Sequence, residues 1–75
     1  MYVIAAVYGA DRLYYAGPAD TENASQAGVH RFTPEPDRAT VFLDFFPAMR
    51  ASWRAAPPRK HEGTMMTSVK VDEAA

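Results

Sequence analysis

Cysteine is absent from this chain of 75 residues. Its absence excludes disulfide bonds, cysteine nucleophiles and zinc sites built on thiolates. Because disulfides are typical of oxidising compartments, a chain without cysteine fits a reducing compartment, and we expect a cytoplasmic protein. A domain of this size must then be stabilised by its own small core or with the help of a partner.

Long apolar runs and an excess of charge are missing too. The apolar segment 2–8 stops at Gly9 and has no cationic residue before it, so we expect neither a signal peptide nor a membrane span. Eight Lys and Arg side chains stand against nine Asp and Glu side chains, which gives a net charge of -1. This balance argues against a generic polyanion binder and against an acidic DNA mimic.

The residues that are present favour one folded domain over residues 1–75. Apolar residues make up 48% of the chain and aromatic residues 12%, which is enough for a packed core. Segment 2–8 is rich in Tyr, Val and Ile, and segment 12–16 contains Leu13 and two tyrosines. Gly9 lies between the two segments, which predicts a β-hairpin with its turn at 9–10 or 10–11. Either turn places the same side chains together on one face: Ile4, Ala6, Tyr8, Leu13 and Tyr15.

The middle of the chain is interrupted by turn-forming residues. Segment 20–28 is polar and predicts a loop that could hold one helical turn over 21–27. Residues 29–33 predict a short extended segment, and the prolines that follow limit it to an edge strand at most. Residues 37–42 predict a short first helix with Pro36 at its start.

The second half of the chain predicts the main helix and a closing strand. Asp44 is placed to cap a helix over 45–56, in which Phe46, Met49 and Trp53 recur at helical spacing. We expect this stripe to face the sheet, with Trp53 at least partly buried. A basic connector over 57–63 leads to an alternating strand over 65–71, and residues 72–75 should fray.

Taken in order, these elements predict an α+β fold. We expect a small antiparallel sheet, made of the N-terminal hairpin and the C-terminal strand, with one main helix, preceded by a short helix, packed on one face.

Several of these segments form a pattern that consists of Tyr2-Val3-Ile4, Tyr14-Tyr15-Ala16-Gly17, Phe32-Thr33, Asp37, Ala39, Phe42, Ala48 and Val69-Lys70-Val71-Asp72-Glu73. This pattern resembles short orphan proteins of phages and mobile elements. Members of that group with known roles are often inhibitors of host defence, such as anti-CRISPR proteins, so the resemblance implies a binding role without a defined target and carries over no functional residue. The insert at 20–28 and the prolines at 57–58 depart from the commoner compact form.

Residues that could carry catalysis are few and scattered. His30 and His61 are the only histidines, 31 positions apart, with no other ligand at the spacing of known metal motifs. The serines lie in no strand-to-helix elbow, and the isolated glycines form no phosphate-binding loop. We therefore expect no enzymatic activity, no cofactor and no metal ion.

Two features point instead to a binding surface. The hairpin is apolar on both faces, and one helix can cover only one of them, so the other face is open to a partner or to the 18–33 segment. We expect Tyr8 and Tyr15 on the open face, with Val3, Val7 and Tyr14 in the core.

The second feature is a basic stripe. Arg50, Arg54, Arg59 and Lys60 lie within a short segment that contains Trp53 and no acidic residue. These cations could bind an acidic partner or simply complement the dipole at the end of the helix.

We therefore expect a non-enzymatic protein-binding module that occludes a site on a host or viral complex. The most specific form of this hypothesis is inhibition of a CRISPR effector. A nucleic-acid accessory protein that uses the basic stripe is the second hypothesis, and a homodimer or larger homo-oligomer is the third.

Overall fold

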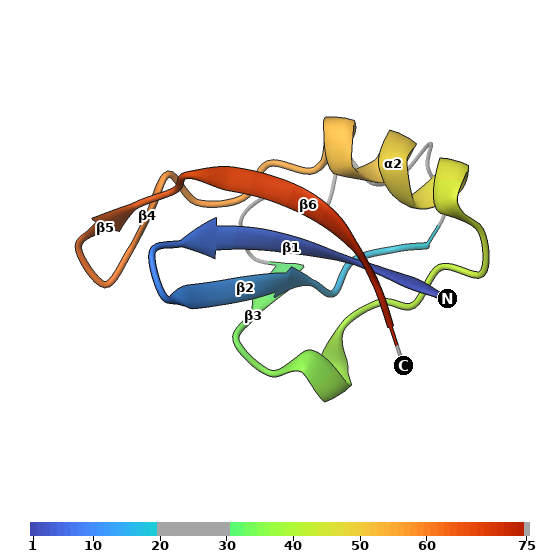
Figure 1. Cartoon of the computed structure of the whole chain (residues 1–75), viewed down its shortest axis with the longest axis horizontal. Helices are drawn as coiled ribbons and strands as arrows, with labels where there is room; N and C mark the ends of the chain where they lie inside the picture. Colours follow the sequence, from blue (N-terminus) through green and yellow to red (C-terminus); the bar gives the residue numbers. More distant parts are fainter. Residues whose placement is uncertain (20–30, 75) are drawn as a thin grey trace.

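The first two strands form the expected hairpin and lie inside a four-stranded sheet (Figure 1). The computed structural model describes residues 1–19 and 31–74. Strands β1 (Tyr2–Tyr8) and β2 (Asp11–Tyr15) are joined by a turn at 9–10, where Gly9 has a φ of 61°, a conformation that glycine adopts without steric cost.

Strand β1 is central because β6 (Ser68–Glu73) pairs with its other edge. The short strand β3 (Phe32–Thr33) pairs with the outer edge of β2 and is the expected edge strand, although the strand is shorter than the expected segment 29–33. Positions 29 and 30 lie outside the described residues. All neighbours are antiparallel, in the order β3-β2-β1-β6. The expected fraying at the C-terminus is wrong for Asp72 and Glu73, which belong to β6 and pair with β1.

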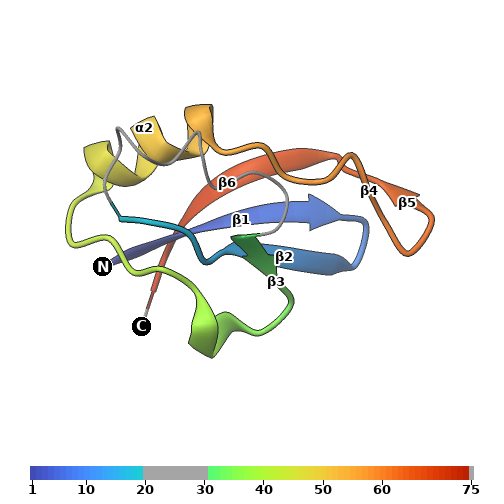
Figure 2. The same cartoon turned by 180° about the vertical axis from the view of Figure 1, so that it is seen from behind.

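Helix α2 (Phe45–Arg54) lies against one face of this sheet, so the α+β fold class is confirmed (Figures 1 and 2). Asp44 stands at the N-cap in an extended conformation, although its side chain makes no capping hydrogen bond. The helix ends at Arg54, two residues earlier than expected, and Pro57 and Pro58 follow in an irregular connection.

The expected helix over 37–42 is largely wrong. Only a 3-10 turn, η2 (Pro36–Arg38), is present. Beyond it the backbone is drawn into contact with the sheet: the Thr40 amide donates to the Tyr15 carbonyl at 2.8 Å, and Tyr2 and Phe42 exchange two backbone hydrogen bonds of 2.8 Å. These bonds to the ends of β1 and β2 replace the helical ones.

The connector and the closing strand contain a second hairpin that the sequence pattern did not predict. Strands β4 (Lys60–His61) and β5 (Thr64–Met65) are joined by Glu62 and Gly63, which both have positive φ angles. The chain then leaves this hairpin and joins β1 as β6. The expected helical turn over 21–27 lies outside the described residues.

The core lies on the side of the sheet that α2 partly covers, the face opposite to the one we expected. Tyr8 and Tyr15 are 1% and 0% exposed, so their expected place on an open face is wrong. Val3, Val7 and Tyr14, which were expected in the core, are instead half-buried on the other face. Two adjoining clusters make up the core: Ile4, Tyr15, Phe42, Ala48 and Ala51 in one, and Ala6, Tyr8 and Leu13 in the other.

Candidate functional site

Helix α2 turns its small side chains toward the sheet. Ala48 and Ala51 are fully buried in the core cluster, and Ala55, just past the helix, packs against it. Small residues let the helix backbone approach the sheet closely, while larger side chains such as Ile4 and Tyr15 rise from the strands to fill the space. The inner face of α2 therefore needs no large apolar residue of its own.

Two of the large apolar residues of α2 point outward as a result, whereas Met49 is half-buried. Phe46 and Trp53 are 68% and 74% exposed, so the expected burial of Trp53 is wrong. Positions two apart on a helix differ by about 200° in direction, which places the Phe46 face nearly opposite the Ala48 face. Phe46, Arg50 and Trp53 follow the spacing i, i+4, i+7 and share one side of the helix. We call these three residues the outer helix face.

Phe46 packs against a row of aromatic rings that begins in the sheet. The Tyr2 and Phe45 rings meet edge to face with centroids 5.5 Å apart, and the Phe45 and Phe46 rings meet in the same way at 5.9 Å. Such contacts restrict ring orientation and contribute roughly 0.5–1.5 kcal/mol each beyond their buried area. The Phe46 ring is exposed and yet supported from one side.

The basic stripe is divided between two places. Arg50 and Arg54 are exposed on α2, whereas Arg59 and Lys60 are exposed at the start of the β4–β5 hairpin, which projects at the far end of the sheet in Figure 1. The sequence places the four cations close together along the chain, but the irregular connection after α2 carries the second pair away from the first. A partner on the outer helix face meets Arg50 directly.

The open face of the sheet is covered by its own charged side chains. Val7 lies beside Arg12 and Ser68 on the neighbouring strands, and Arg12 forms an ion pair of 2.8 Å with Asp72. The aliphatic stems of such long side chains shield apolar neighbours from water. This face is therefore a mixed surface and lacks the exposed aromatic residues of α2.

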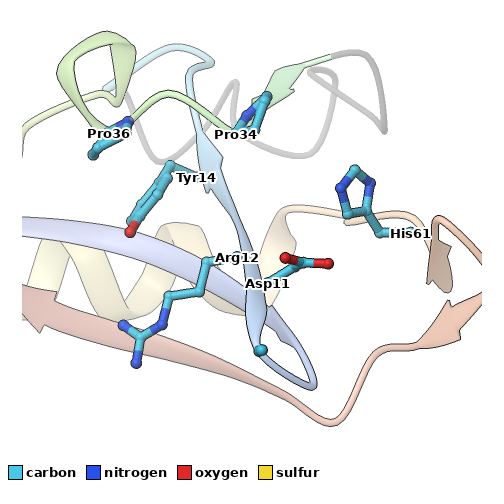
Figure 3. Close-up of a pocket in the computed structure, with 7 residues that line it drawn as sticks. Asp11, Arg12, Tyr14, Pro34, Pro36 and His61 are labelled. Carbon is cyan, nitrogen blue, oxygen red and sulfur yellow. The ribbon is translucent and has the colours of Figure 1, made fainter.

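Two shallow cavities lie beside this face, with volumes of about 310 Å³ and about 450 Å³. Both are lined by Arg12, Tyr14 and Pro36. Figure 3 shows the smaller one, in which the carboxylate of Asp11 extends toward His61. Sequence reasoning missed this meeting because the two residues are 50 positions apart and the β4–β5 hairpin was not predicted.

The two buried tyrosines serve the core and not a surface. The Tyr8 hydroxyl donates to the Pro58 carbonyl at 2.6 Å, and the Tyr15 hydroxyl donates to the Pro18 carbonyl at 2.7 Å. Burial raises the pKa of both phenols above the ordinary 10.0, and the charge of Arg31 partly opposes the rise at Tyr15. Both groups are neutral donors at physiological pH and are closed to a partner.

Comparison of the chain with protein-family models, with curated proteins and with solved structures found no match. Among the described residues, no helix is long and apolar enough to cross a membrane.

Proposed function

We propose that this protein is a non-enzymatic binding module that docks onto another protein through the outer helix face. The observation that carries the proposal is the reversed arrangement of α2, with alanines buried and both Phe46 and Trp53 exposed. Large aromatic side chains left in water lose the free energy that burial would provide, roughly 25 cal/mol for each Å² of apolar surface. A complementary groove on a partner would recover it.

The arrangement fits helix-in-groove recognition. That mode uses apolar anchors at i, i+3 or i+4, and i+7 on one side of a helix, and Phe46 and Trp53 occupy the first and last of these positions. Trp and Arg are enriched among the residues that dominate binding energy at protein interfaces. Arg50 between the two anchors favours a groove with an acidic rim.

The biological role within this proposal is inhibition by occlusion. The resemblance to phage orphan proteins suggests a host defence complex, such as a CRISPR effector, as the target. The absence of cysteine fits action in the host cytoplasm. A small rigid domain that presents one helix can block a groove without any chemistry of its own.

Nucleic-acid binding is the second candidate, because an exposed tryptophan beside arginines can stack on a base while the cations meet phosphates. Salt separates the two candidates. Affinity for a nucleic acid falls steeply as salt rises, since counterions are released, whereas a groove built on apolar anchors is much less sensitive. Self-association through the same face is a third hypothesis, and sedimentation of the purified protein tests it by measuring the oligomeric state.

The experiment compares capture of a host partner by the parent protein and by Phe46→Ala/Trp53→Ala, followed by affinity measurements with the purified partner. We expect the affinity to fall at least about 100-fold. Both side chains are mostly in water, so the free energy of unfolding should fall by no more than about 2 kcal/mol, chiefly through loss of the Phe45–Phe46 ring contact. Met65→Ala, an exposed apolar residue on the β4–β5 hairpin, is the matched control and should bind normally.

Charge-reversal variants provide a second test of the outer helix face. Arg50→Glu/Arg54→Glu should weaken an acidic partner, whereas Arg59→Glu/Lys60→Glu, the same change on the distant hairpin, should leave affinity within about threefold. Full affinity in the Phe46→Ala/Trp53→Ala variant, or equal losses in the two charge-reversal pairs, would remove the outer helix face as the binding site.

A further inference from the structure

Two hairpin turns that are distant in the sequence lie side by side at one end of the sheet. The rings of Tyr8 and His61 pack with centroids 5.6 Å apart. Gly9, in the β1–β2 turn, lies against Thr64: a Cβ atom added to Gly9 would be 3.5 Å from the Thr64 Cγ2. The hydrogen bond from Tyr8 to the Pro58 carbonyl holds the chain just before β4 against β1. The two turns are thus fixed relative to each other.

This juxtaposition gathers three side chains that can ligate a metal ion. Asp11 is the first residue of β2, directly after the first turn, whereas His61 ends β4 and Glu62 lies in the second turn. One ligand atom from each side chain lies within 4.8 Å of the other two. His61 is half-buried against Tyr8, while both carboxylates are exposed and have no ion-pair partner among the described residues.

We propose that Asp11, His61 and Glu62 form a binding site for a divalent transition-metal ion of the Zn²⁺ class. One imidazole nitrogen and two carboxylate oxygens are a ligand set that Zn²⁺ accepts, whereas Mg²⁺ and Ca²⁺ favour oxygen ligands alone. The two negative charges lie close together and have no ion-pair partner in the part of the chain that the structure describes, which favours a cation between them.

The geometry requires only small side-chain movements. Ligand atoms around tetrahedral Zn²⁺ lie about 3.3 Å apart, given metal–ligand distances near 2.0–2.1 Å. The exposed carboxylates of Asp11 and Glu62 can close the difference from 4.8 Å by rotating, with His61 as the fixed ligand. The cavity of about 310 Å³ is lined by Asp11 and His61 and gives access for water or another ligand at the remaining position (Figure 3).

A substitution at Glu62 can show whether a loss of metal affinity is caused by loss of a ligand or by unfolding. Its φ of 50° makes it the only non-glycine residue with a positive φ among those described. Asn, Asp and Gly are the residues favoured in such a turn. Replacing Glu62 with Asn removes a ligand and relieves the backbone at the same time, so affinity and stability should move in opposite directions.

The test is calorimetric titration of the whole protein with ZnCl₂, with CoCl₂ absorption as a report of coordination. We expect one Zn²⁺ per chain and no binding of Mg²⁺ at the same concentrations. His61→Ala and Asp11→Asn should each weaken Zn²⁺ at least about tenfold. His30→Ala, the same change at the other histidine, should bind as the parent does, and circular dichroism should show that each variant is folded.

Glu62→Asn should melt at a higher temperature than the parent without metal and bind Zn²⁺ at least about tenfold more weakly. Zn²⁺ affinity no better than millimolar, equal affinity for Mg²⁺, or loss of binding in His30→Ala would each overturn the proposal. The site lies on the β4–β5 side of the molecule, away from the outer helix face (Figure 1). The metal-binding proposal can therefore be tested independently of the proposed function.

Discussion

Tyr8 and Tyr15 stabilise the fold by filling the core while keeping their hydroxyl groups hydrogen-bonded. Each phenol donates to the carbonyl of a proline, Pro58 or Pro18, in a segment that has no strand partner at that point. A buried hydroxyl without an acceptor would cost about 1–3 kcal/mol, so the two proline carbonyls allow tyrosine where phenylalanine would otherwise be expected. The tyrosines thereby tie two irregular segments to the sheet.

Alkaline pH should destabilise the protein through these two residues. Burial raises the pKa of both phenols in the folded state above the value of 10.0 that applies in the unfolded chain. The unfolded state then loses its protons first, so the stabilisation is complete below about pH 10 and is lost as the pH rises through the folded pKa values. Urea unfolding measured between neutral pH and about pH 11 should show this fall.

Tyr8→Phe is the variant that checks the cause. It removes one ionising group, so the alkaline loss of stability should be smaller than in the parent. At neutral pH it should lower the free energy of unfolding by about 1 kcal/mol, because the hydrogen bond to Pro58 is lost. An unchanged alkaline profile would show that other groups cause the transition.

The orientation of these tyrosines was only half predictable from the sequence. Alternation along the hairpin correctly placed Tyr8 and Tyr15 on the same face as Ile4. It could not say which face is buried, because both faces carry apolar residues. The decision comes from α2 and from Phe42, which cover the tyrosine side, and those contacts join residues far apart in the chain.

At the scale of elements, α2 shows why size is a poor guide to burial in a small domain. The helix begins where it was expected and ends two residues early. The stripe of Phe46, Met49 and Trp53 was expected inside because its side chains are large, yet Phe46 and Trp53 are exposed and Met49 is half-buried. The sheet already fills the core with tyrosines, isoleucine and valines, which leaves room only for alanines on the helix. The candidate site was hidden from sequence reasoning for the same reason.

Enlarging the inner face of α2 should therefore be more harmful than truncating the outer one. Ala51→Leu places an isobutyl group where the helix backbone meets the sheet, and overpacking of this kind destabilises by about 1–3 kcal/mol. Thermal or urea unfolding would measure the loss. Ala56→Leu, the same change at an exposed position just after the helix, should have little effect. Equal stability of the two variants would contradict close helix–sheet packing.

At the scale of the whole molecule, the fold closes by joining the two ends of the chain. Strand β6 pairs with β1 from Tyr2 to Val7, and the Ala74 amide donates to the Met1 carbonyl at 2.7 Å. Strong alternation and turn chemistry made the α+β class predictable. The β4–β5 hairpin was not, because its turn residues, Glu62 and Gly63, lack the Asn-Gly or Asp-Gly signal that marks such turns.

This topology predicts a gradient of local stability that amide hydrogen exchange can measure. Ala5 and Ala6 of β1 pair with β2 on one edge and with β6 on the other, and both are fully buried, so their amides should exchange only when the whole domain unfolds. The β4–β5 hairpin has only two paired positions, and Lys60 and Met65 are exposed. Its amides should therefore exchange by local opening and be much less protected.

The same measurement links the gradient to the proposed metal site. If Zn²⁺ binds Asp11, His61 and Glu62, it connects the β4–β5 hairpin to the first turn, and local opening of the hairpin must then release the ion. Added Zn²⁺ should slow exchange in β4–β5 while the outer helix face, at the other end, is unaffected. Protection of β4–β5 equal to that of β1 without metal would mean that the hairpin already unfolds together with the core, and the predicted gradient would be wrong.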